Sequence, residues 1–318
     1  MKAAVYTKYG PPDVVQITDI EKPIPKDNEV LVKVRASSVN PLDWHFMRGA
    51  PFVVRIGAGL RKPKITRLGV DLAGQVEAAG RNVTQFKPGD EVFGCMRGAF
   101  AEYICVTEDK LAPKPPNLSF EEAAAVPVAA ISALQGLRDK GHIQRGQKVA
   151  IDGASGGVGT FAIQIAKSFG AEVTAVCSTK NVDKARSLGA DHIIDYTQQD
   201  FTKTGQRFDL ILGANAYHSI FDYRRALNPR GICVVVGGGG ILILQVLLLG
   251  SLFPLIGNKK VRLFMAEINQ KDLILLKDLL ETGKIAPVID RRCPLSELPE
   301  AIRYLEEGHA QGKVVITI

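Results

Sequence analysis

The sequence lacks paired cysteines, runs of basic residues and long uninterrupted apolar stretches, and each absence argues against a class of protein. Its five cysteines are scattered and form no CxxC pair, so neither a disulfide framework nor a four-cysteine zinc site is expected. The formal net charge is +7, but the basic residues form no polybasic arm, so nucleic acid is not an expected partner. We interpret the cysteines as small buried apolar residues. They are Cys95, Cys105, Cys177, Cys233 and Cys293.

The N-terminal residues MKAAVYTKYG have neither the apolar core of a signal peptide nor the arginine-rich character of a transit peptide, which predicts a cytoplasmic protein. The most apolar segment is ILILQVLLLGSLFPLI, residues 241–256. About 16 residues rise only about 24 Å as a helix, too little to cross a bilayer, so no membrane span is expected. The segment is expected to cap an apolar substrate cleft or to form a subunit contact, with peripheral membrane contact as a third alternative.

Two domains are expected in a chain of 318 residues, of which 46% are hydrophobic. Up to about residue 120, short β-rich runs alternate with turns such as KPGD; from Lys148 onward, strands alternate with helical stretches. The sequence therefore predicts an α/β protein with a strand-rich domain at residues 1–120 and a Rossmann domain, a doubly wound parallel sheet, at residues 121–267. Residues 268–318 are expected to complete the first domain, and Ser119 is the expected N-cap of the helix at the boundary.

The stretch GASGGVG, residues 153–159, follows an apolar strand and opens an amphipathic helix. Ala154, Gly156 and Gly159 occupy the three glycine positions of the GxGxxG fingerprint. Gly156 lets the backbone approach a pyrophosphate, Gly159 lets the helix lie against the strand, and the helix N-terminus supplies amide donors. Because the motif stands between two strands, as the fingerprint requires, it predicts a dinucleotide site rather than an unrelated glycine turn.

The turn CSTKNVDK, after the second strand of this domain, indicates which dinucleotide binds. NAD sites place an acidic residue at the end of that strand, and this turn has none there. Ser178 and Thr179 offer hydroxyl groups, and Lys180 and Lys184 offer positive charge, which together suit the 2′-phosphate of NADP(H). The alternative is that both lysines are solvated surface residues.

Several phrases in the correct order resemble the zinc-less quinone oxidoreductase branch of the medium-chain dehydrogenase/reductase superfamily. They are MKAAVYTKYGPPDVV, SSVNPLDW, GVDLAGQVEAAG, FKPGDEVFG, AVPVAAISALQGL, GASGGVG, SLGADHIIDY and GHAQGKVVITI. The resemblance covers essentially the whole chain. It implies that the strand-rich domain is GroES-like and catalytic.

Zinc-dependent members of that superfamily carry a cysteine where this sequence has Asn40, and Gly-His-Glu where it has Gly69-Val70-Asp71. Neither Asn40 nor Val70 provides a thiolate or imidazole ligand for zinc. The histidines also show no metal-ligand spacing, so no metal is expected. They are His45, His142, His192, His218 and His309.

Without a Lewis acid, simple alcohol oxidation is disfavoured, whereas reduction of a conjugated carbonyl spreads the arriving charge onto an oxygen that a few donors can stabilise. The resemblance implies an NADPH-dependent, zinc-independent oxidoreductase that reduces a small apolar quinone or α,β-unsaturated carbonyl by hydride transfer. A homodimer or a monomer is expected. The alternatives are a zinc-less alcohol dehydrogenase or carbonyl reductase, and a non-catalytic NADPH-binding protein.

The resemblance also implies which residues contact the cofactor. One departure is Gly213, where the family commonly has aspartate. The implied cofactor residues are Asn40, Ser132, Ser155, Gly156, Gly157, Val158, Ser178, Thr179, Lys180, Tyr196, Gly238 and Lys313.

For catalysis, Asn40 is expected to orient the nicotinamide carboxamide or the substrate oxygen. Asp43 is expected to tie down the loop or to polarise a proton-delivering water, with an Asx turn after Pro41 as the alternative. Trp44 and Phe46 form either an aromatic wall over the acceptor or part of a packed loop. The stretch from Asp43 to Val70, rich in glycine and arginine, is expected to be a long loop that caps the substrate cleft.

Overall fold

The computed structural model describes residues 1–250, 258–308 and 310–318. The chain divides into two compact units. The first comprises Met1–Val128, Ile268–Thr282 and Pro287–Ile318, and the second comprises Ala129–Glu267 and Gly283–Ala286. The division therefore falls after Val128, beyond the boundary predicted near residue 120, because the intervening residues pack on strands of the first unit.

The first unit is built around a mostly antiparallel sheet in which β3 (Glu29–Val39) is central. The strands run in the order β14-β15-β3-β4-β5-β7, β6 pairs with β3, and β1 and β2 form a separate pair. Val30, Val32 and Val34 alternate along β3 and are all buried in one apolar cluster. The other strands are β1 (Lys2–Val5), β2 (Gln16–Asp19), β4 (Asp71–Ala79), β5 (Glu91–Cys95), β6 (Tyr103–Thr107), β7 (Leu111–Pro113), β14 (Ile289–Pro294) and β15 (Lys313–Thr317).

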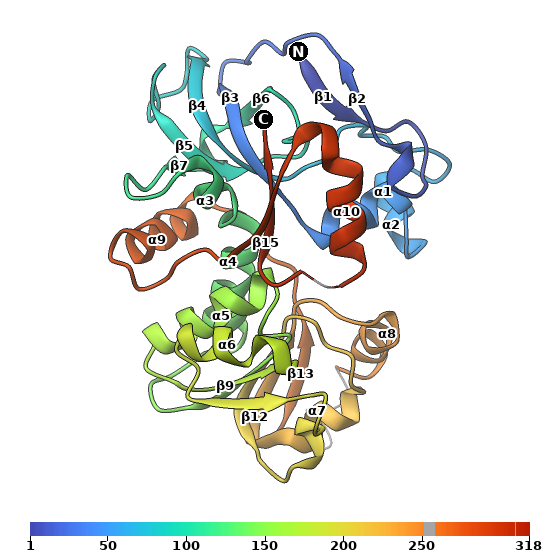
Figure 1. Cartoon of the computed structure of the whole chain (residues 1–318), viewed down its shortest axis with the longest axis vertical. Coiled ribbons are helices and arrows are strands. Elements are labelled where there is room, and N and C mark those ends of the chain that lie inside the picture. Colours follow the sequence, from blue (N-terminus) through green and yellow to red (C-terminus); the bar gives the residue numbers. More distant parts are fainter. Residues whose placement is uncertain (251–257, 309) are drawn as a thin grey trace. The chain divides into compact units, whose positions relative to one another are not determined.

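The C-terminal residues contribute strands and helices to this unit. β15 pairs antiparallel with β3, with Val314 opposite Val39, and parallel with β14. α10 (Leu298–Glu306) packs beside α1 (Pro41–Arg48), as Figure 1 shows. An ion pair between Arg48 and Glu306 links the two helices, with one guanidinium nitrogen 2.8 Å from a carboxylate oxygen. The same unit contains α3 (Phe120–Ala124) and α9 (Gln270–Glu281).

The stretch predicted as a long loop between Asp43 and Val70 contains helical structure, so that prediction is wrong in part. α1 includes Asp43, and α2 (Val53–Ala58) follows it. The cause is local: Asn40 and Asp43 form a capping box, with Pro41 at the first helical position, where its missing N–H costs nothing.

The second unit is a six-stranded parallel sheet in the order β10-β9-β8-β11-β12-β13, which confirms the predicted doubly wound fold. The chain adds β9 and β10 on one side of β8 and then β11, β12 and β13 on the other side. The connecting helices therefore cover opposite faces of the sheet, α5 and α6 one face and α7 and α8 the other (Figure 1). The strands are β8 (Lys148–Asp152), β9 (Glu172–Cys177), β10 (His192–Asp195), β11 (Phe208–Gly213), β12 (Leu227–Val235) and β13 (Lys260–Leu263). The helices are α4 (Pro127–Gln135), which spans the division between the units, α5 (Gly157–Ser168), α6 (Val182–Ser187), α7 (Ile220–Ala226) and α8 (Gly240–Leu249).

Three further sequence predictions meet the structure here. Ser119 caps α3 in a capping box with Glu122, as predicted. All five cysteines are free, and Cys95, Cys177 and Cys233 are buried. In the described part of the chain, every helix is too short or too polar to span a membrane. Residues 251–256 of the apolar segment, and His309, lie outside the described residues.

Candidate functional site

The turn after β8 is made by Gly153, one residue before the position that the fingerprint match gave to Ala154. Its φ is +82°, in the left-handed region, and a Cβ there would lie 2.6 Å from the Cβ of Asn215. An added Cβ at Gly159 would lie 2.1 Å from the Gly153 carbonyl oxygen, so only glycine lets the helix approach the strand. Gly156 differs, because the nearest atom to an added Cβ there is 3.8 Å away. Gly156 therefore borders open space.

The N-terminus of α5 has no capping side chain. Its N-cap is Gly156, whereas Ser119 and Ser219 close capping boxes at α3 and α7. The first-turn amides of a helix have no acceptor within the helix, and they carry a partial positive charge. The N–H of Gly156 donates to the Gly153 carbonyl at 3.3 Å, whereas the first-turn N–H groups of Gly157 and Val158 have no acceptor within the helix. With the open space beside Gly156, this helix N-terminus fits the pyrophosphate of a dinucleotide.

The predicted 2′-phosphate residues lie where β9 ends. Ser178 is nearly buried, and its hydroxyl accepts a hydrogen bond from Asn181 Nδ2 at 3.0 Å. Thr179 and Lys180 are exposed. Tyr196 is 59% exposed, and its backbone N–H donates to the Cys177 carbonyl, which holds it beside the same strand end.

An acidic residue that the sequence argument did not consider lies at this strand end. Asp195, the last residue of β10, is opposite Cys177 in the register of the two strands. Thr179 Oγ1 donates to its Oδ2 at 2.5 Å, and this hydrogen bond is the main cause that lowers the pKa of Asp195, so the carboxylate is charged. The carboxylate comes from the third strand of the domain rather than the second. The phrase IIDY in the sequence was the signal for it.

The remaining predicted cofactor residues of the second unit come from two other elements. Ser132 lies on α4 and is 6% exposed. Gly238 lies in the turn after β12 and forms a bridge with Ala216. Gly213 ends β11, and a Cβ there would lie 2.8 Å from the Ala216 Cβ, so the turn leaves little space for a side chain at this position.

Asn40, Asp43 and Lys313 come together in the first unit. Lys313 Nζ donates to Asn40 Oδ1 at 2.6 Å and to Asp71 Oδ2 at 3.1 Å. Asn40 Nδ2 donates to Asp71 Oδ2 at 2.8 Å and to the Ser38 carbonyl at 3.2 Å. Lys313, Asn40 and Asp71 are at most 3% exposed, so a buried ammonium contacts a buried carboxylate directly and the amide of Asn40 bonds to both.

These contacts restrict what Asn40 can do. Both N–H donors of its amide are occupied, so the side chain has no donor left for a substrate oxygen. Its Oδ1 accepts a hydrogen bond from Lys313 at 2.6 Å. Lys313 uses two of its three N–H donors in the described contacts, so its third is the remaining donor of the pair.

Asp43 holds the chain around Asn40. Its Oδ2 accepts from the Asn40 backbone N–H at 2.8 Å, and its Oδ1 accepts from the Gly69 N–H at 3.1 Å. The residue is 1% exposed, and burial raises its pKa to about 7. Of the roles considered for Asp43, this geometry fits the one that ties down the loop.

Asp71 is a site residue that sequence reasoning missed, since it was considered only as a replacement for a metal ligand. It is fully buried and accepts from Ser38 Oγ at 2.6 Å and from the Val128 N–H at 2.8 Å, besides Asn40 and Lys313. A charged residue at the start of a predicted buried strand was the available signal.

The two aromatic residues of α1 are packed within the first unit. Trp44 packs against an apolar cluster of this unit, with its ring 3.7 Å from that of His45. Phe46 lies under the guanidinium of Arg97, 3.7 Å from the ring centroid. These contacts favour the packed-segment alternative over an aromatic wall.

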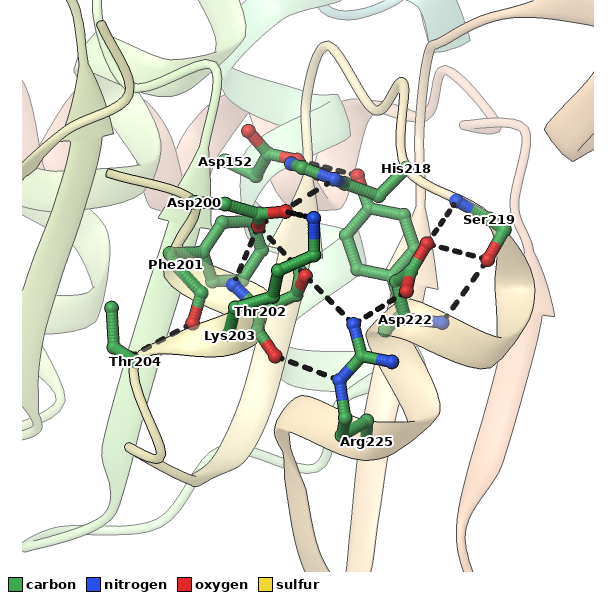
Figure 2. A network of polar contacts seen from close by, with 11 residues as sticks. Asp152, Asp200, Phe201, Thr202, Lys203, Thr204, His218, Ser219, Asp222 and Arg225 are labelled. Carbon is green, nitrogen blue, oxygen red and sulfur yellow. Dashed lines mark hydrogen bonds and ion pairs between the residues drawn. The ribbon is translucent and has the colours of Figure 1, made fainter. Parts of the chain in front are cut away.

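A second buried carboxyl group that sequence reasoning missed lies in the second unit, immediately before the glycine turn. Asp152 ends β8, is 7% exposed, and accepts a hydrogen bond of 2.5 Å from the Tyr223 hydroxyl. Burial raises its pKa to about 6. Figure 2 shows Asp152 beside His218, whose Nδ1 lies 3.8 Å from Asp200 Oδ1. The network thus extends from the turn to the segment before α7.

The described site defines a class of protein: a Rossmann unit with a dinucleotide-binding turn, joined to a strand-rich unit with a buried polar cluster. Family models match both parts, an alcohol dehydrogenase GroES-like domain at residues 26–116 and a zinc-binding dehydrogenase at residues 188–316. The chain belongs to the medium-chain dehydrogenase/reductase superfamily, in its quinone oxidoreductase branch, and is an oxidoreductase.

Individual relatives agree with this membership. The chain is 38% identical to a 2-methylene-furan-3-one reductase of Solanum lycopersicum and 34% identical to a chloroplastic NADPH-dependent alkenal/one oxidoreductase of Arabidopsis thaliana. Each match covers 99% of this chain and 79% of the relative. The solved quinone oxidoreductase of Coxiella burnetii is 30% identical, with a TM-score of 0.87 over 100% of this chain and 99% of that one.

The description of the second family model mentions zinc. Among residues 1–250, 258–308 and 310–318, no group of three or more His, Cys, Asp or Glu side chains is arranged to hold a metal ion. Independence of zinc stays a prediction, as do the cytoplasmic location and the monomeric or homodimeric state.

Proposed function

We propose that the chain reduces quinones or α,β-unsaturated carbonyls with a hydride from NADPH. The observation that carries the proposal is the uncapped N-terminus of α5, which the turn from Gly153 to Gly159 presents to a dinucleotide pyrophosphate. The names of the tomato and Arabidopsis relatives and of the Coxiella structure support the substrate class.

The bound nicotinamide supplies the hydride, and the residues of the chain bind, orient and stabilise. Reduction of a conjugated carbonyl places negative charge on the carbonyl oxygen, which requires a donor or a cation. In the first unit the available group is Lys313, whose third N–H we assign to an oxygen of the cofactor or of the acceptor. Asn40 and Asp71 position the ammonium through contacts of 2.6 and 3.1 Å, and Asp43 fixes the backbone of Asn40.

The proposed preference for NADPH over NADH rests on the end of β9. Thr179 and Lys180 are exposed there, and a 2′-phosphate gains charge-assisted hydrogen bonds from such groups. The carboxylate of Asp195 opposes this preference, although Thr179 and Thr197 already donate hydrogen bonds to it. We therefore propose that the chain prefers NADPH to NADH and that the carboxylate of Asp195 makes this preference smaller.

The test is a screen of NADPH oxidation by the purified chain with quinones, enones, saturated aldehydes and saturated ketones. We expect turnover with quinones and enones and little with the saturated compounds. Equal rates with saturated carbonyls would instead support the zinc-less carbonyl reductase. Tight NADPH binding without oxidation by any acceptor would support the non-catalytic NADPH-binding protein.

A further inference from the structure

Helix α8 exposes large aliphatic side chains along its length. Ile241, Leu244, Leu247 and Leu248 are 78%, 57%, 63% and 64% exposed. The helix, GILILQVLLL, contains no charged residue, and its single polar side chain, Gln245, makes a hydrogen bond within the protein. Gln245 Oε1 accepts a hydrogen bond of 3.0 Å from the Ile220 N–H of α7. Four bulky aliphatic side chains on one short helix are more than the isolated surface residues that a protein normally shows.

The opposite side of α8 is firmly packed, so the exposure does not reflect an undocked helix. Leu242 and Val246 are 2% and 6% exposed and belong to the core cluster that also contains Val261 of β13. The exposed side chains are therefore held in place by a buried face. Substitutions among them are not expected to disturb the core.

Two exposed aromatic residues lie near α8, one at its N-terminal end and one on α7. Tyr217 is 72% exposed, and its ring lies 3.4 Å from the position that a Cβ at Gly239 would take. Phe221 is 56% exposed and belongs to α7, which packs against α8. We call the exposed residues of α8 together with Tyr217 and Phe221 the α8 surface. Aromatic residues of this kind favour the boundary between lipid and water.

Basic residues lie on or beside α7 and β13, two elements that pack against α8. Lys259 precedes β13, and its Nζ donates to the Arg224 carbonyl of α7 at 2.9 Å. Burial lowers the pKa of Lys259, and repulsion from Arg207 and Arg224 lowers it further, so the three cations stand close together. The acidic residue of α7, Asp222, is paired with Arg225 at 2.5 Å. The flank of the surface is therefore complementary to an anionic partner.

We propose that the α8 surface docks on anionic phospholipid bilayers. A helix of 10 residues rises about 15 Å, half the thickness of a bilayer core, so α8 would lie in the interface rather than cross it. The aliphatic side chains enter the acyl region, and Arg207 and Lys259 attract the phosphate headgroups. A second copy of the chain is the less suitable occupant, because pairing through this face would bring two sets of cations together.

The test is cosedimentation of the full chain with vesicles of phosphatidylcholine alone and of phosphatidylcholine mixed with phosphatidylglycerol. We expect binding to the mixed vesicles that weakens with added salt, and little binding to phosphatidylcholine alone. The double variant Leu247→Asp, Leu248→Asp should lose binding and keep the melting temperature. Ile24→Asp, at a residue 85% exposed in the first unit, is the matched control and should bind like the unmodified chain.

The cationic flank is tested separately. Arg207→Ala with Lys259→Ala should weaken binding to mixed vesicles about 30-fold, since each basic residue near an anionic surface contributes about 1 kcal/mol. Lys8→Ala with Arg61→Ala changes the net charge equally in the first unit and should have little effect. Absence of binding to mixed vesicles would overturn the proposal. A dimer in light scattering that the Leu247, Leu248 variant abolishes would also overturn it and assign the surface to a second copy.

Discussion

The Nζ atom of Lys313 lies 2.6 Å from Oδ1 of Asn40, although 273 residues separate the two in the sequence. The contact exists because β15 pairs antiparallel with β3, which brings the first residue of β15 next to the residue that follows β3. It fixes the orientation of the Asn40 amide, since Oδ1 faces the ammonium and Nδ2 faces Asp71. The amide therefore hydrogen-bonds to both members of a buried ion pair whose charges are in direct contact at 3.1 Å.

Asn40→Ala should lower turnover more than it weakens NADPH binding. Loss of the amide removes one hydrogen bond that holds the Lys313 ammonium and one that holds the Asp71 carboxylate, so both groups can move, and a shift of about 1 Å costs on the order of 100-fold in rate. The dissociation constant of NADPH should change less than about fivefold, or 1 kcal/mol, because the pyrophosphate is held elsewhere. Single-turnover reduction and NADPH titration on the same preparation measure both quantities.

The control is Ser37→Ala, which removes the hydrogen bond of 2.6 Å from Ser37 Oγ to the Asp71 carbonyl without touching the amide of Asn40. It should cost about 1 kcal/mol of stability and leave turnover intact. Equal turnover of Asn40→Ala and Ser37→Ala would show that Asn40 does not position Lys313 for the reaction.

The unmodified chain should bind NADPH more tightly than NADH, by about 1–3 kcal/mol or roughly 5- to 150-fold, if the residues after β9 bind the 2′-phosphate. The double variant Lys180→Ala, Lys184→Ala should reduce the ratio of the NADPH affinity to the NADH affinity. Asp195→Asn should raise this ratio about fivefold, because a repulsion of about 1 kcal/mol between the carboxylate and the 2′-phosphate is removed. The affinity for NADH is the internal control and should hardly change. Equal dissociation constants in the unmodified chain would contradict the assignment.

Much of the fold could be predicted because local chemistry determines it. The periodicity of the buried strands, the glycines after β8 and the capping box of Ser119 all depend on residues close together in the chain. The exception is α1, which the sequence predicts as part of a loop because the helix has only 8 residues and its apolar pattern is correspondingly short. Pro41 and the capping box of Asn40 and Asp43 could have revealed it.

The polar clusters were harder to predict because sheet pairing decides them. Asp71 meets Lys313 only when β3 lies between β4 and β15. Asp195 approaches Thr179 only through the register of β9 and β10. Sequence reasoning selected Asn40, Asp43 and Lys313 through a family resemblance. It could not derive that the amide of Asn40 has no donor left for a substrate.

The purified chain should contain no stoichiometric zinc and should keep its activity in a strong chelator. The physical reason is that Asn40 takes the position of a thiolate ligand, and the nearby Asp71 carboxylate is already neutralised by Lys313 at 3.1 Å. Elemental analysis of the protein as purified measures the metal content. One zinc per chain, lost together with activity in chelator, would contradict the prediction.

Asp152→Asn should become more stable relative to the unmodified chain as pH rises from about 4 to 7. Burial raises the pKa of Asp152 to about 6 in the folded chain, against an ordinary value of 3.8. The folded chain therefore holds this proton more tightly than the unfolded chain does. The protonated carboxyl group stabilises the unmodified chain fully below about pH 4, and this stabilisation is lost as pH rises through 6. Between about pH 4 and 7, the unfolding free energy of Asp152→Asn should rise by about 3 kcal/mol relative to that of the unmodified chain.

Denaturant unfolding of both chains at several pH values tests this expectation. Tyr223→Phe removes the hydroxyl that donates to the carboxylate at 2.5 Å, so it should raise the pKa of Asp152 further and move the loss of stability to higher pH. Parallel pH profiles for Asp152→Asn and the unmodified chain would show that Asp152 does not titrate in this range.

Two glycine substitutions in the turn after β8 should have opposite consequences. Gly159→Ala places a methyl group 2.1 Å from the Gly153 carbonyl oxygen, so it should lower the unfolding free energy by about 1–3 kcal/mol. Gly156→Ala meets no atom closer than 3.8 Å and has a φ of −78°, so the melting temperature should not fall. Its methyl group should nevertheless weaken NADPH binding about tenfold or more, because it occupies the approach of the pyrophosphate. Gly57→Ala, with nothing within 4 Å, is the control and should leave NADPH affinity unchanged. Unaltered NADPH affinity in Gly156→Ala would place the pyrophosphate elsewhere.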